Sequence, residues 1–161
     1  MKRVTIYLFI LPFLMIFFLN SCKEKTEPIE KSVLWEQGTG KYNNYRIPSL
    51  IVTQKGTLLA FCEGREGGDS GNIDLLLKRS EDNGKSWSNE QVVWNDGSNT
   101  CGNPCPVVDE TTGRIWLWMT WNNGNDHETE IIHQTASSEV FHSFYFRLAE
   151  WAWCFSSRRL P

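Results

Sequence analysis

The sequence lacks any excess of positive charge. It has 16 lysine and arginine residues against 19 aspartates and glutamates, which gives a formal net charge of −3. No basic patch stands out along the chain, although proteins that bind nucleic acid through its phosphates normally carry one. We therefore predict that this chain has no nucleic-acid partner.

The sequence also lacks an apolar run long enough for a membrane-spanning helix. The longest run, from Val4 to Leu19, has 16 residues, whereas spanning a bilayer takes roughly 20. Two cations precede it and Leu19-Asn20-Ser21-Cys22 follows it, which is typical of a secretory signal with a lipoprotein cleavage box. An uncleaved membrane anchor is the alternative, but it gives no reason for a cysteine at that place.

These features predict the organisation of the N-terminal region. Residues 1–21 form a lipoprotein signal peptide, Cys22 receives the lipid, and residues 22–32 tether the lipid to a folded domain. The chain is then exported and lipid-anchored in the bacterial envelope, facing the periplasm or the cell surface, with the membrane as one partner.

Neither cysteine nor histidine is spaced as a metal site requires. Four cysteines remain beside Cys22, namely Cys62, Cys101, Cys105 and Cys154. Their spacing is not that of a zinc ribbon, and in an exported chain Cys101 and Cys105 could instead pair, or some cysteines could be small buried groups. Residues 126–133 hold two histidines but no H-E-x-x-H motif, so we predict a solvated polar loop there, and neither a metal nor a cofactor.

No segment between Val33 and Thr135 holds an apolar stripe at helical spacing over three turns. The segment consists instead of short apolar or alternating runs, each followed by turn residues. The predicted strands cover residues 49–53, 57–62, 73–78, 91–94, 106–108 and 114–120. This pattern predicts an all-β domain of antiparallel hairpins over residues 33–135, and it leaves a sandwich and a propeller equally open.

Residues 80–87, Ser-Glu-Asp-Asn-Gly-Lys-Ser-Trp, fit the pattern S-x-D-x-G-x-[ST]-W. Asp82 can accept hydrogen bonds from the backbone amides of its own turn, Gly84 can adopt a left-handed conformation, and Trp87 can pack under the hairpin. The pattern resembles the Asp box, a structural turn in the sheets of sialidases. Asp boxes also occur in proteins without sialidase activity.

Upstream, residues 45–48, Tyr-Arg-Ile-Pro, resemble the [FY]-R-I-P motif that opens the catalytic domain of sialidases. The resemblance implies that Arg46 is one of three arginines that bind the sialic acid carboxylate, a task that suits a planar guanidinium. An ordinary arginine at the start of a strand is the alternative. In the glycine-rich segment 63–71, the resemblance implies that Asp69 is the acid/base and that Arg65 contacts substrate, whereas Asp74 belongs to the following strand.

Asn103, within residues 102–106, matches a position where the family places a polar residue near the sugar, although it could equally cap a loop before proline. The four motifs stand in family order. The resemblance therefore implies an exo-alpha-sialidase that acts on sialylated glycoconjugates, folded as a six-bladed β-propeller of which this chain holds roughly the first two blades.

The family mechanism also uses a tyrosine nucleophile with its glutamate and two further arginines, and we find no candidates for them. Residues 136–161 contain no glycine, asparagine or aspartate but seven aromatic residues. We interpret this tail as frameshifted, and the alternative is an amphipathic helix built on Phe144, Leu148, Trp151 and Phe155. We expect an inactive N-terminal fragment of marginal stability. A non-catalytic sialoglycan-binding lipoprotein and an inert gene remnant are the alternatives.

Overall fold

The computed structural model describes residues 30–133, 135, 147–148 and 153–154, and everything below concerns those residues. The expected signal peptide, the lipidation site Cys22 and most of the tether lie outside them, as does most of the tail. Among the described residues, no helix is long and apolar enough to cross a membrane.

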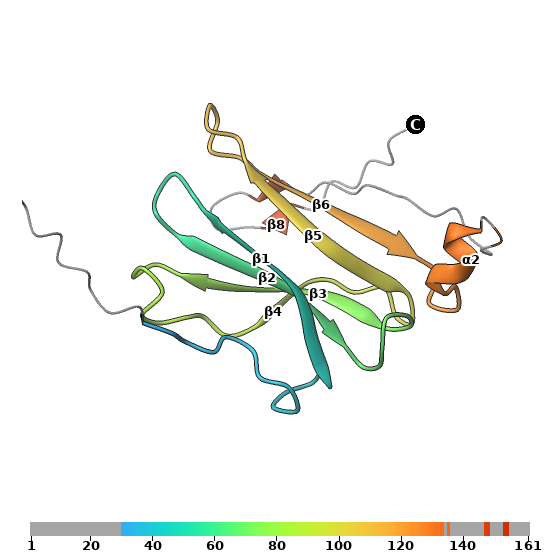
Figure 1. The fold of residues 1–161 in the computed structure, drawn as a ribbon. Coiled ribbons are helices and arrows are strands. Elements are labelled where there is room, and N and C mark those ends of the chain that lie inside the picture. Colours follow the sequence, from blue (N-terminus) through green and yellow to red (C-terminus); the bar gives the residue numbers. More distant parts are fainter. Residues whose placement is uncertain (1–29, 134, 136–146, 149–152, 155–161) are drawn as a thin grey trace, which may run out of the picture. The chain divides into compact units, whose positions relative to one another are not determined.

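The first half of the described chain is a four-stranded antiparallel meander (Figure 1). Its strands are β1 (Asn44–Val52), β2 (Leu58–Arg65), β3 (Ile73–Ser80) and β4 (Gln91–Trp94). The β1–β2 turn contains Gly56 with a φ of 83°, a conformation that glycine adopts without steric cost. The predicted hairpin is confirmed. Its strands are longer than the apolar pattern indicated, because β1 begins at Asn44 instead of Ser49 and β2 ends at Arg65 instead of Cys62.

A second antiparallel hairpin, formed by β5 (Thr100–Val108) and β6 (Ile115–Asn122), lies against the first one in Figure 1. One parallel residue pair, Ile73 with Thr100, joins β5 to β3. The two-residue strands β7 (Arg147–Leu148) and β8 (Trp153–Cys154) add to the edge of β6. The all-β prediction is therefore confirmed, and the sheet is open rather than closed on itself.

The hydrophobic core lies between the meander and the second hairpin. Its buried members are Leu59, Phe61, Leu75, Leu77, Val93, Cys101, Ile115, Leu117 and Met119. On β2 and β6 they occur at alternate positions, because successive side chains of a strand point to opposite faces. A smaller cluster of Tyr42, Cys62 and Leu76 covers the opposite face of the meander, so β3 is buried on both sides.

The β1–β2 and β5–β6 hairpins have the same internal register. In β1 the pairing shifts between Arg46 and Ser49, and in β5 it shifts between Gly102 and Cys105. The matching pairs are Arg46 with Glu63 and Gly102 with Thr120 before the shift, and Ser49 with Phe61 and Cys105 with Trp118 after it. Each bulge contains a left-handed residue directly before a proline, Ile47 with a φ of 50° and Asn103 with a φ of 52°. The second hairpin is thus a structural repeat of the first.

The structure decides one open alternative and differs from the sequence predictions at two further places. Cys101 and Cys105 do not pair: both are unpaired thiols, and Cys101 is buried in the core whereas Cys105 is exposed, so their side chains do not meet. Residues 102–105, which lie outside the predicted strands, are part of β5 itself. The predicted polar loop at 126–133 contains a short helix, α2 (Glu128–Ile132), which is too short to show an apolar stripe.

The tail is described at only four positions. Leu148 lies in β7, where it pairs with Ile115, so the helical alternative is wrong at that residue. The other residues of that proposed helix, Phe144, Trp151 and Phe155, lie outside the described residues.

Candidate functional site

The structure brings three of the predicted site residues together at one end of the first hairpin. Arg46 is near the start of β1, Arg65 ends β2, and Asp69 lies in the β2–β3 loop. Arg46 Nη1 lies 3.3 Å from Asp69 Oδ1, and Arg65 Nη1 donates to the same oxygen. Arg46 and Asp69 are 23 residues apart in sequence, and the antiparallel pairing of β1 with β2 makes them neighbours.

The bulge in β1 follows directly after Arg46. Ile47 has left-handed backbone geometry, which a β-branched residue adopts only when its surroundings impose it. Pro48 has no backbone N–H and therefore removes one hydrogen bond from the ladder at this point. The Arg46 side chain remains 61% exposed, so its guanidinium is accessible to an incoming anion.

Arg65 differs from Arg46 in being almost fully buried, with a side chain 8% exposed. Its Nε donates to Glu63 Oε2 at 2.8 Å, and its Nη2 donates to the same oxygen. Its Nη1 donates to the backbone oxygen of Gly68 at 3.3 Å and to Asp69. A guanidinium held on three sides cannot turn away, so Arg65 is a fixed donor in the site.

Asp69 is an exposed carboxylate held by two cations, with a side chain 77% exposed. The hydrogen bond from Arg65, reinforced by the charges of Arg65 and Arg46, lowers the pKa of Asp69 below its ordinary value. The carboxyl group is therefore ionised at neutral pH. A role as proton donor requires a further negative charge nearby, which would raise this pKa.

Asn103 does not touch these three residues directly. Its Nδ2 donates to Thr120 Oγ1 at 2.8 Å, and its backbone N–H donates to Glu63 Oε1 at 2.7 Å. Glu63 therefore links Asn103 to Arg65. Sequence reasoning missed Glu63, although one signal was available. Glu63 and Arg65 continue the buried face of Phe61 at alternate positions, and a charged side chain on a buried face is normally paired with one of opposite charge.

Asp74 lies inside the sheet and takes no part in this cluster. Its carboxylate is fully buried and accepts hydrogen bonds from Tyr42 at 2.5 Å, Lys41 at 3.2 Å and Asn95 at 2.5 Å. Its assignment to the strand that follows the glycine-rich segment is confirmed, because it belongs to β3.

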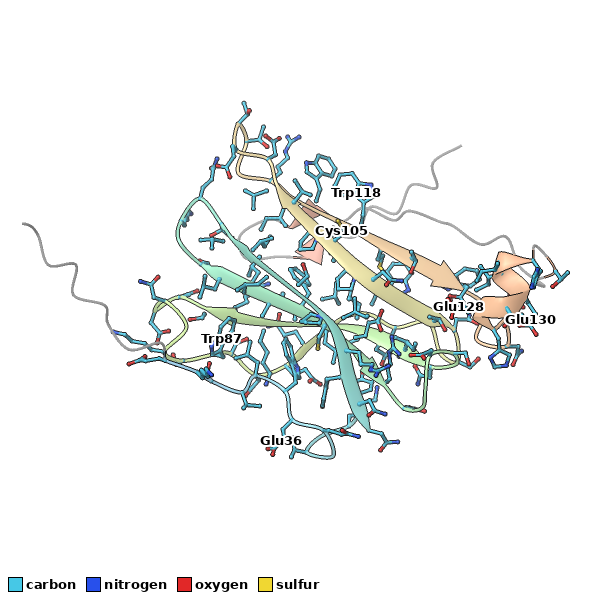
Figure 2. The ribbon with its side chains drawn as sticks, in the orientation of Figure 1. Glu36, Trp87, Cys105, Trp118, Glu128 and Glu130 are labelled. Carbon is cyan, nitrogen blue, oxygen red and sulfur yellow. The ribbon has the colours of Figure 1, made fainter. Side chains whose placement is uncertain are left out.

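The Asp-box residues form the turn between β3 and β4. Asp82 accepts from Ser80 Oγ at 2.8 Å, from Ser86 N at 2.9 Å and from Ser86 Oγ at 2.6 Å. Gly84 has a φ of 83°, and the indole N–H of Trp87 donates to its carbonyl oxygen at 3.1 Å. Figure 2 shows Trp87 at this end of the meander. The contacts of the four residues Ser80, Asp82, Gly84 and Trp87 are those of a structural turn.

An open cleft of about 540 Å³ adjoins Arg46. It is mostly apolar, and its lining includes Trp35, Tyr45, Cys62 and Trp87. Asp69, Arg65 and Asn103 do not line it, so the cleft and the Arg46–Asp69 pair are separate features that share one residue. Among the residues that the structure describes, no group of three or more histidine, cysteine, aspartate or glutamate side chains is placed to hold a metal ion.

Comparison with known proteins gives a family match and several relatives. A family model described as a BNR repeat-like domain matches residues 56–147. The exo-alpha-sialidase of Aspergillus fumigatus is 38% identical over 99 residues, covering 53% of this chain and 24% of that protein. The sialidase of Bacteroides fragilis is 32% identical over 91 residues, covering 50% and 17%. The sialidase of Paraclostridium sordellii is 34% identical over 119 residues, covering 67% and 29%.

Among solved structures, the chain resembles Hadza microbial sialidase Hz136 with a TM-score of 0.59 and 25% sequence identity. The match covers 70% of this chain and 25% of that one. The chain thus spans less than a third of the length of each of these relatives.

Proposed function

Because the chain belongs to the sialidase family with BNR repeats, and its strands form part of a sialidase-type propeller, we propose that it carries part of a pocket for terminal sialic acid. In this proposal β1–β4 is one blade and β5–β6 begins the next. The observation that carries the proposal is the junction of Arg46, Arg65 and Asp69 at one carboxylate oxygen. The reaction class is removal of terminal sialic acid from glycoconjugates.

Arg46 supplies the anion-binding group of this pocket. Its guanidinium is exposed, and its contact with Asp69 is long for a charged hydrogen bond, at 3.3 Å. The carboxylate of sialic acid would therefore exchange with Asp69 for the same guanidinium, and a bidentate pair with Arg46 would fix the orientation of the sugar.

The same exchange changes Asp69. Losing Arg46 as a partner and gaining a neighbouring anion both raise the pKa of the Asp69 carboxyl group, while Arg65 continues to hold the side chain. A raised pKa suits a group that protonates the departing glycosidic oxygen and then activates water. Substrate binding and the protonation of the acid are thus coupled through a single arginine.

The 161-residue polypeptide alone is proposed to be inactive. The family nucleophile is a tyrosine, and the two tyrosines in the described part of the chain are unsuited to that role. Burial and the hydrogen bond to Asp74 raise the pKa of Tyr42, and burial raises that of Tyr45. Neither hydroxyl is activated for attack. A non-catalytic sialoglycan-binding lipoprotein is the second candidate, favoured by the same observation.

Release of a fluorescent aglycone from a sialoside, measured with the full chain, separates these two functions. We expect no release above background and weak binding of sialyllactose, with binding lost in Arg46→Ala. Arg114→Ala is the matched control, because Arg114 is an exposed arginine at the turn before β6. Equal binding by both variants would reject Arg46 as the anion-binding group, and turnover by the wild-type chain would reject the inactive assignment.

We further propose that the chain is held at the bacterial membrane by a lipid on Cys22. The support is the order of cations, apolar run and cysteine at the start of the sequence. Labelled palmitate supplied to expressing cells should enter the wild-type chain and not Cys22→Ser. Equal labelling of both chains would refute the assignment.

A further inference from the structure

Glu63 is a buried carboxylate whose two oxygens serve two different strands. Its side chain is 2% exposed. Oε2 accepts the Nε and Nη2 protons of Arg65, on the same strand β2, and Oε1 accepts the backbone N–H of Asn103, on β5.

The second hairpin is shaped to receive this carboxylate. A Cβ atom built on Gly102 would overlap Glu63 Oε1 and lie 3.0 Å from the carboxyl carbon. Gly102 occupies the register position that Arg46 has in the first hairpin, since Arg46 pairs with Glu63 as Gly102 pairs with Thr120. The position that carries a site arginine in one hairpin is therefore reduced to glycine in the other, which leaves room for Glu63.

These contacts form one continuous chain of hydrogen bonds. It runs from the Asn103 amide through Glu63 and Arg65 to Asp69, and from there to Arg46. Every member except Arg46 and Asp69 is fixed by burial or by the backbone. The two exposed members are the ones that a ligand can reach.

We propose that Glu63 is a positioning residue that holds the Arg65 guanidinium against Asp69 and ties this end of the first hairpin to β5. The role deepens the proposed function, because Asp69 is the acid/base of that function. The geometry itself is independent of any substrate. Glu63 acts through Arg65 and touches no reacting atom.

The substitution Glu63→Gln tests this role because glutamine keeps the shape but not the acceptors. Glu63 accepts from three donors, whereas a glutamine amide has one oxygen and an NH₂ group that donates. Either Arg65 or the Asn103 amide then faces a donor in place of an acceptor. We expect the Arg65 guanidinium to lose its fixed orientation.

The readout is the pKa of Asp69, measured by NMR titration of its side-chain carbonyl carbon in the full-length chain. Positioning predicts that Glu63→Gln raises this pKa toward the ordinary value of about 3.9, because the Arg65 hydrogen bond that lowers it is lost. If Glu63 were only a nearby negative charge, removing it would lower the pKa of Asp69 further. A fall or no change therefore overturns the proposal.

Glu66→Gln is the matched control, since Glu66 is an exposed glutamate in the same loop whose substitution removes the same charge. We expect the pKa of Asp69 in this variant to fall slightly or stay unchanged. A rise as large as that in Glu63→Gln would show that the effect is not specific to the buried carboxylate, and it would overturn the proposal.

Gly102→Ala is a second, independent variant that keeps the Glu63 charge and displaces its carboxylate. It should raise the pKa of Asp69 as Glu63→Gln does, and it should accelerate hydrogen exchange of the Asn103 amide. Should neither variant fold, exchange in the wild-type chain decides, because a Glu63-bound Asn103 amide must be protected. An unprotected amide overturns the proposal. Failure of sialoside binding with these results intact rejects the proposed function alone.

Discussion

The β1–β2 and β5–β6 hairpins share a register, a bulge and a left-handed residue before proline, yet only the first carries charge into the site. Arg46, Glu63 and Arg65 occupy positions that correspond to Gly102, Thr120 and Asn122 in the second hairpin. The backbone therefore does not distinguish the two hairpins. Three side-chain positions do, and the glycine among them accommodates a carboxylate of the other hairpin.

The same comparison explains which apolar side chains are buried. Phe61 and Trp118 are equivalent in register, but Phe61 is fully buried whereas Trp118 is 37% exposed. The face of the first hairpin that carries Phe61 packs on the second hairpin, and the corresponding face of the second hairpin has no such cover among the described residues. Figure 2 shows Trp118 and Cys105, which are paired in register, on the outer side of β5–β6. Equivalent positions thus have unequal packing.

The largest expected effect follows from this inequality. Phe61→Ala should lower the free energy of unfolding by about 3–5 kcal/mol, because it removes a fully buried aromatic ring from the core. Trp118→Ala, its matched partner, should cost about 1 kcal/mol. Urea denaturation, monitored by the far-ultraviolet circular dichroism of the backbone, measures both losses. Losses of equal size would mean that the two faces are packed alike.

An intermediate effect is expected at the left-handed residues. Asparagine tolerates this conformation better than isoleucine does, since a β-branched side chain is strained there. Asn103→Ile should therefore lower the free energy of unfolding by about 1–2 kcal/mol. The loss of the side-chain hydrogen bond from Asn103 to Thr120 adds to this decrease.

The reciprocal substitution, Ile47→Asn, makes the first bulge like the second. It should raise the free energy of unfolding by about 1 kcal/mol, reduced by the loss of partly buried apolar surface. The same urea titrations report both signs. Destabilisation by Ile47→Asn as large as that by Asn103→Ile would contradict the equivalence of the two bulges.

Local chemistry explains how much of this fold the sequence reveals. The turn at Gly56 and the Asp box at 80–87 are encoded within a few residues, so the strands on either side of them could be predicted. Arg46 and Asp69 could be assigned to one pocket because the motifs that contain them resemble those of sialidases. The start of β5 was missed because its bulge and two prolines interrupt the apolar alternation that marks a strand.

Contacts between the hairpins could not be predicted from sequence. The bond between Glu63 and the Asn103 amide spans 40 residues and depends on how the second hairpin packs. The helix α2 was missed because its five residues show no stripe, although its acidic first turn, Glu128 and Glu130, is typical of a helix start. Two kinds of feature therefore could not be predicted from the sequence: the packing of one hairpin on the other, and elements as short as α2.

The smallest expected effect is on the pH dependence of stability. It involves two turns in which an aspartate accepts hydrogen bonds, one between β3 and β4 and one between β5 and β6. Hydrogen bonds from the side chain and amide of Ser86 hold the pKa of Asp82 at about 2, and Thr112 and the Thr111 amide lower the pKa of Asp109.

Because the folded chain binds fewer protons than the unfolded one, both contributions are present above about pH 4 and are lost as the pH falls toward the folded pKa. Asp82→Asn should therefore flatten the decline of unfolding free energy between about pH 4 and 2, and Asp109→Asn should flatten it less. Thermal denaturation across this range measures the slopes, and identical slopes in wild type and Asp82→Asn would show that the Asp box does not contribute to acid sensitivity.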